Sequence, residues 1–90
     1  MPKFVIERNF PEPFVMEPDE AGKQMASQIE ACNAQMGIKW LFSFLSADRR
    51  KLYCVDEAPN AEALRNAARQ LNIPCDAVTE VSDLRPEMFQ

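Results

Sequence analysis

The stretch Ile38–Pro59, I-K-W-L-F-S-F-L-S-A-D-R-R-K-L-Y-C-V-D-E-A-P, decides the fold of this 90-residue chain. It contains two runs rich in aromatic and branched aliphatic residues, and the charged segment Ser46–Lys51 separates them. Two such runs joined by a short polar segment are typical of a β-hairpin. The stretch therefore predicts two adjacent antiparallel strands in the middle of the chain.

The first strand of this hairpin is apolar on both of its faces. Because side chains alternate along a strand, its aromatic residues should point to one face and its leucines to the other. The two sets are Trp40, Phe42 and Phe44, and Leu41 and Leu45. A strand that is apolar on both faces must be covered on both faces. The hairpin thus predicts a helical layer on one side of its sheet and a second cover on the other.

Composition and length indicate one soluble domain that spans residues 1–90. Hydrophobic residues make up 47% of the chain and charged residues 27%, as in ordinary globular proteins. The longest apolar run, Trp40–Leu45, is far shorter than the about 20 residues that cross a bilayer. The N-terminal segment M-P-K-F-V-I-E-R lacks the apolar core of a secretion signal. We therefore expect a cytoplasmic protein that makes no contact with a membrane.

Charge and residue usage exclude several classes of function. The net charge of −4 and the pI near 4.7 argue against a nucleic-acid partner, because nucleic-acid binding requires clustered Lys and Arg. The chain has no histidine, so it lacks both the usual general base near neutral pH and the commonest nitrogen ligand of transition metals. Its three cysteines are dispersed, which is a poor pattern for a disulfide framework or a zinc site.

The segments around the hairpin predict two helices and two further strands. Pro18 suits the first position of a helix, Gly37 suits its end, and Asn60 suits the N-cap of the second helix. Apolar residues recur at helical spacing in both predicted helices. The predicted elements outside the hairpin are a strand at Lys3–Asn9, a helix from Pro18 to Met36, a helix from Ala61 to Leu71 and a strand at Ala77–Asp83.

The predicted order is βαββαβ, and with right-handed crossovers it gives a ferredoxin-like α+β plait. The antiparallel sheet would have the strand order 4-1-3-2 and would carry both helices on one face. The opposite face would then expose part of the apolar hairpin. Exposed apolar patches usually mark an interface, and a two-fold homodimer would bury this one. We therefore expect a homodimer.

Several segments together resemble one known family, namely small bacterial ferredoxin-like domains of unknown function that include a nickel-binding member. The resemblance extends over most of the chain and keeps the order of the segments. It implies a dimeric α+β barrel. The similar segments are F-V-I-E-R-N-F-P at 4–11, W-x-x-S-F at 40–44, Y-C-V at 53–55, A-P-N-A-E-A-L-R at 58–65, I-P at 73–74 and T-E-V at 79–81.

The same resemblance implies a metal site that this chain does not reproduce. The family pattern places histidine where this chain has Phe42 and Ala67, and neither of these side chains binds metal. Nickel favours imidazole, with thiolate or carboxylate as substitutes. The remaining donors are Glu7, Cys54, Asp56 or Glu57, and Glu80. We assign no metal ligand, no catalytic residue and no cofactor from the sequence.

The sequence favours a module that binds a small ligand or a metal ion between its sheet and a dimer partner. The candidate ligand-binding residues are Trp40, Phe42, Phe44, Glu7, Cys54 and Glu80. Each has a structural alternative: the aromatic side chains would suit dimer packing, the cysteine a small core position, and the carboxylates a solvated sheet edge. The sequence does not fix which side of the sheet each of these side chains faces, because a slip of one residue in register exchanges the two sides of a strand.

Two enzyme classes remain as alternatives. The opening M-P-K-F-V-I is similar to that of tautomerases, which use an N-terminal proline as general base, and loss of Met1 would expose Pro2. That chemistry requires an amine of lowered pKa near cationic side chains in an apolar pocket. A cofactor-independent oxygenase on the same dimeric barrel would need only a mostly apolar site. No residue pair in the sequence indicates either reaction.

Overall fold

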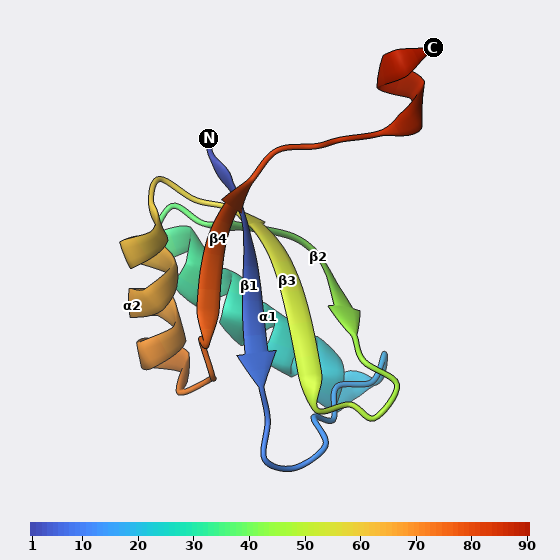
Figure 1. Ribbon diagram of the computed structural model, residues 1–90. Helices are drawn as coiled ribbons and strands as arrows, with labels where there is room; N and C mark the ends of the chain where they lie inside the picture. Colours follow the sequence, from blue (N-terminus) through green and yellow to red (C-terminus); the bar gives the residue numbers. More distant parts are fainter.

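The computed structural model describes residues 1–90 and shows an antiparallel sheet with both helices on one of its faces (Figure 1). The strand order is β2-β3-β1-β4, which confirms the predicted βαββαβ plait and its order. Neither helix has the length and the apolar character that crossing a membrane requires. The elements are β1 (Lys3–Asn9), α1 (Glu20–Gln35), β2 (Lys39–Leu45), β3 (Lys51–Glu57), α2 (Ala61–Leu71), β4 (Ala77–Val81) and a short 3-10 helix, η1 (Pro86–Phe89).

Polar caps fix where the helices begin. Asp19 is the N-cap of α1, and its Oδ1 accepts a hydrogen bond from the Gly22 amide at 2.9 Å. The prediction that the helix starts at Pro18 was therefore wrong by two residues, because the Asp19 carboxylate caps the helix by accepting from the free Gly22 amide. No residue with a side chain fits at position 22, since a Cβ on Gly22 would lie 1.7 Å from the Glu17 carbonyl oxygen. Asn60 caps α2 as predicted, with its Oδ1 2.9 Å from the Ala63 amide.

A β-bulge in β2 changes which aromatic side chains share a face. Trp40 pairs with Asp56, whereas Phe42 pairs with the adjacent Val55, and the register shifts between them. Neighbouring partners on β3 point to opposite faces, so Trp40 lies on the helix side and Phe42 on the open side. The expectation that Trp40, Phe42 and Phe44 point the same way was therefore wrong for Trp40. An extra residue in one strand cannot be located from alternation alone.

The hydrophobic core lies between the sheet and the helices, mostly near α2. Register places the alternating residues Phe4, Ile6 and Arg8 of β1 on this side, and all three are buried. The buried apolar cluster joins β1, β3 and the residues that flank the hairpin to α2, and it consists of Phe4, Ile6, Ile38, Cys54, Ala58, Leu64 and Ala67. Cys54 is therefore a core side chain, while α1 covers a less densely filled part of the same layer.

Candidate functional site

A cavity of about 420 Å³ lies between the helices and the sheet. Met25 and Ile29 of α1, Leu64 and Leu71 of α2, and Trp40 of β2 contribute to its wall. Of its 19 lining residues, 14 are hydrophobic. A cavity of this size that is mostly apolar, with a few polar groups, is the usual form of a small-molecule site.

Three polar side chains that line the cavity are buried, namely Arg8, Asn33 and Asp56. Asp56 is only 4% exposed, and its Oδ1 has no hydrogen-bond partner. Burial raises the pKa of Asp56 from 3.8 to about 6, and the positive charge of Arg8 opposes part of this rise. A buried carboxylate oxygen without a partner is costly, so it is a strong acceptor for a donor that enters the cavity.

Arg8 is held in place by two contacts. Its Nη1 donates to the Pro74 carbonyl oxygen at 2.6 Å, and its Nε donates to the Cys54 Sγ at 3.5 Å. Neither contact involves Asp56, and the structure contains no ion pair between the two side chains. The guanidinium therefore acts on Asp56 through its charge rather than by direct bonding, which leaves the carboxylate available to another group.

Trp40 lines the same cavity and has a fixed orientation. Its indole Nε1 donates to the Ser43 Oγ at 2.9 Å, and Ser43 also lines the cavity. The chain has one tryptophan, so the fluorescence of this residue reports on the cavity alone. A ligand in the cavity would change the surroundings of the indole directly.

The opposite, open face of the sheet carries exposed aromatic rings. Phe42 is 48% exposed and Phe44 is 64% exposed. The two rings make an edge-to-face contact, with centroids 5.4 Å apart and an interplanar angle of 84°. Their partners on β3 are Val55 and Tyr53, so they form an apolar patch that no helix covers. We call Phe42, Phe44, Tyr53 and Val55 the open-face patch.

The six predicted ligand-binding residues do not lie in one site. Trp40 and Cys54 line the cavity on the helix side. Phe42, Phe44 and Glu7 belong to the open face, since Glu7 pairs with Tyr53 across β1 and β3. Glu80 pairs with Phe4 and is exposed at the β4 edge. The bulge in β2 separates the aromatic residues, and strand alternation separates Glu7 from Cys54.

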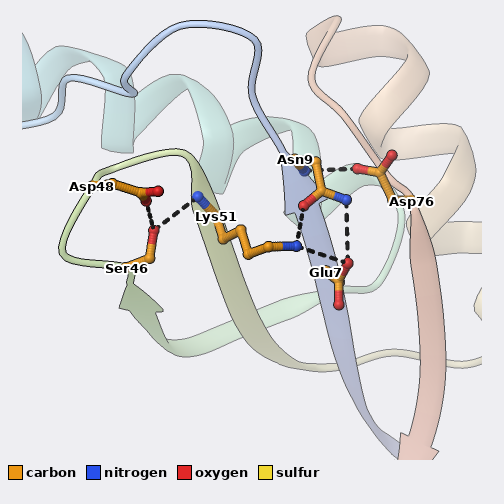
Figure 2. Close-up of polar contacts among 6 residues, drawn as sticks. All are labelled: Glu7, Asn9, Ser46, Asp48, Lys51 and Asp76. Carbon is orange, nitrogen blue, oxygen red and sulfur yellow. Dashed lines mark hydrogen bonds and ion pairs between the residues drawn. The ribbon is translucent and has the colours of Figure 1, made fainter.

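Glu7 is already engaged by neighbouring side chains (Figure 2). Its Oε2 accepts from the Asn9 Nδ2 at 3.2 Å and lies 3.7 Å from the Lys51 Nζ. The Lys51 Nζ also donates to the Asn9 Oδ1 at 2.8 Å, and the backbone amide of Asn9 donates to the Asp76 Oδ2 at 2.7 Å. This network ties the end of β1 to the start of β3 and to Asp76, which precedes β4. Its geometry explains Glu7 as a structural residue near the end of a central strand.

Of the buried polar residues of the cavity, only Asp56 was among the predicted donors, although the sequence also carried a signal for Arg8. Arg8 alternates with Phe4 and Ile6, which places it on the same face as two strongly apolar residues. A charged residue on a buried strand face needs partners, so the pattern marks a polar site. Asp56 lies on the buried face for the same reason, opposite Phe4. Asn33 lies one residue beyond Cys32 in α1 and offered no comparable signal.

Comparison with known proteins agrees with this architecture. The family model described as "Nickel responsive protein SCO4226-like" matches residues 4–81. The chain belongs to this family. A crystal structure of SCO4226 from Streptomyces coelicolor A3(2) is similar to this SCO4226-like chain, with a TM-score of 0.74 and 15% sequence identity. The match covers 92% of this chain and 99% of the other, and it shows a shared fold. No curated protein matches the sequence significantly.

The residues of this SCO4226-like chain do not fit a nickel site of its own. No group of three or more His, Cys, Asp or Glu side chains is placed to hold a metal ion. Glu7 and Cys54 lie on opposite faces of the sheet, and Cys54 accepts from Arg8. Because the chain has no histidine, a second copy would add no imidazole either. The donor set is therefore unlike the nitrogen-rich set that nickel favours.

Proposed function

We propose that the protein is a binding module for a small, mostly apolar ligand, which it holds in the cavity between the helices and the sheet. The observation that carries this proposal is the Asp56 carboxylate, which lines the apolar cavity and has a buried oxygen without a partner. The protein would act by sequestering or sensing the ligand. Pro2, the base of the tautomerase alternative, is exposed and does not line the cavity.

The chemistry of the cavity indicates the class of ligand. The apolar wall favours a hydrocarbon or aromatic body, and the volume suits a molecule of modest size. Asp56 requires a hydrogen-bond donor, and a protonated amine would supply both the donor and a compensating charge. Arg8 repels a cation, but it is held by Pro74 and Cys54 and is not paired with Asp56. We therefore propose a primary amine or another strong donor on an apolar body.

Three probes with the same apolar body test this proposal: 4-phenylbutylamine, 4-phenylbutanol and 4-phenylbutyrate. We expect Trp40 fluorescence to saturate with the amine, to change less with the alcohol and to change least with the acid, because Asp56 accepts but does not donate when ionised. Ala68→Leu fills part of the cavity and should weaken binding of the amine by roughly tenfold or more. Ala31→Leu, on the exposed side of α1, is the matched control.

Two outcomes would contradict the cavity site. One is the absence of a saturable change in Trp40 fluorescence with any of the probes. The other is equal binding by Ala68→Leu and Ala31→Leu, provided that circular dichroism shows both variants folded. Equal affinity for the amine and the acid would retain the cavity but would reject Asp56 as the group that selects the ligand.

For nickel, we expect no site tighter than about micromolar in calorimetric titration of the purified protein, because imidazole ligands are missing. Cys54→Ala should leave the titration unchanged, since this thiol is buried beside Arg8. A stoichiometric site tighter than micromolar that Cys54→Ala or Glu7→Gln abolishes would contradict this expectation. Such a result would instead support metal binding as the function of the protein.

We further propose that two copies pair through their open faces. The open-face patch has two exposed aromatic rings and no cover from its own chain. Pairing would remove this apolar surface from water, which is the main favourable term in protein association. It would also place Phe42, Phe44 and Glu7 at the boundary between the chains, where a second ligand space would lie.

A further inference from the structure

The last nine residues, Ser82–Gln90, form an extension that leaves the body of the molecule beyond the Lys3–Asp83 ion pair. They lie beyond residues 4–81, which the family model matches. Figure 1 shows that this segment leaves the sheet at the end of β4, runs away from the body of the molecule and ends in η1. We call Ser82–Gln90 the C-terminal arm. It is not part of the four-stranded sheet.

Ion pairs and a short turn hold the shape of the arm. The Lys3 Nζ lies 2.7 Å from the Asp83 Oδ1, which fixes the base of the arm to the start of β1. The Arg85 Nη2 lies 3.0 Å from the other Asp83 oxygen, so these two charges of the arm compensate each other. The Arg85 amide donates to the Met88 Sδ at 3.3 Å within η1. These contacts direct the arm away from the body.

The arm presents large apolar side chains to solvent. Leu84 is 79% exposed and Phe89 is 74% exposed, and Met88 beside them is also exposed. Removing side chains of this size from water lowers the free energy, and three of them exposed within nine residues is unusual for a solvated terminus. The arm therefore has the composition of a docking segment.

We propose that the C-terminal arm of one copy packs on the open-face patch of a second copy. The chain contains two uncovered apolar surfaces, and the direction of the arm keeps them apart within one molecule. In a two-fold dimer that pairs the open faces, the arm of each copy can extend over the part of the partner's open-face patch that the sheets leave uncovered, so one symmetric arrangement buries both apolar surfaces. With Asp83 and Arg85 paired, Glu87 is the one unpaired charged side chain of the arm, so Leu84 and Phe89 can pack on an uncharged aromatic patch. This inference rests on the proposed dimer.

Sedimentation equilibrium of the full chain tests the arm. We expect the wild type to be a dimer and the double variant Leu84→Ser/Phe89→Ser to dissociate at least roughly tenfold more readily, because anchoring apolar side chains dominate interface energy. Phe44→Ser on the receiving face should have a similar effect. Glu87→Gln, which changes the same arm without removing an apolar side chain, should leave the dimer unchanged.

Cross-linking identifies what the arm contacts. Benzoylphenylalanine at position 89, in a mixture of ¹⁵N-labelled and unlabelled chains, should give mixed-isotope cross-links to the β2 peptide that contains Phe42 and Phe44. A monomeric wild type would overturn both the dimer and the arm. A dimer insensitive to Leu84→Ser/Phe89→Ser, or cross-links confined to single chains, would overturn the arm alone and retain the dimer.

Discussion

Arg8→Met is expected to lower the free energy of unfolding by about 3 kcal/mol at pH 7. The substitution keeps the apolar stem of the side chain but removes the charged donor that binds the Pro74 carbonyl oxygen at 2.6 Å. It also removes the positive charge that restrains the pKa of Asp56, so a buried carboxylate is left without any compensating cation. Both effects act in the same direction and at buried atoms, where they are largest.

Urea denaturation at several pH values measures this effect. Asp56 has a folded pKa of about 6, above its ordinary value of 3.8, so its contribution to stability is greatest below the lower value and is lost as pH rises through the higher one. Without Arg8 the folded pKa of Asp56 rises further, and the loss should extend to a higher pH than in the wild type. Arg65→Met, at a solvent-exposed position of α2, is the control and should cost less than about 1 kcal/mol. An equal cost for both variants would contradict the buried role of Arg8.

The fold followed from the sequence because local and global signals agreed. Asn60 marked the start of α2, and the two runs of the hairpin marked β2 and β3. The strand order followed from right-handed crossovers, which leave few arrangements for the order βαββαβ. Each of these inferences uses backbone preferences that act within a few residues. The structure therefore reproduces the elements and their order, and differs at boundaries: α1 starts at Glu20 rather than Pro18, and β4 ends at Val81 rather than Asp83.

The candidate site did not follow, because it depends on features that have no local signal. The register shift between Trp40 and Phe42 moves the indole to the helix side, and alternation alone cannot reveal it. The cavity itself is a property of how loosely α1 packs over the sheet, and this depends on side chains far apart in the sequence. Only Arg8 and Asp56, as charged residues on buried strand faces, were accessible to sequence reasoning.

Asp56→Asn is expected to raise the free energy of unfolding by about 2 kcal/mol at pH 7. A rise in pKa from 3.8 to about 6 corresponds to a cost of about 3 kcal/mol for the ionised group. The amide is nearly isosteric and uncharged, so it removes this cost but keeps a buried polar group. The wild type should gain about 1 kcal/mol between pH 7 and pH 5 from protonation of Asp56, and the variant should lose this dependence.

The control is Glu80→Gln, which removes an exposed carboxylate from β4 and should leave both stability and its pH dependence unchanged. Loss of stability in Asp56→Asn, with no change in the pH profile, would show that the carboxylate is satisfied in the folded chain.

The double variant Arg8→Met/Asp56→Asn separates the two effects. If Arg8 acts on Asp56 through charge, its removal should cost less when position 56 is neutral, and the difference between the two costs measures their coupling. A ligand that pairs with Asp56 would reverse the balance, because the carboxylate that destabilises the empty fold would then stabilise the occupied one. The same carboxylate would thus make stability depend on the ligand, as a sensing role requires.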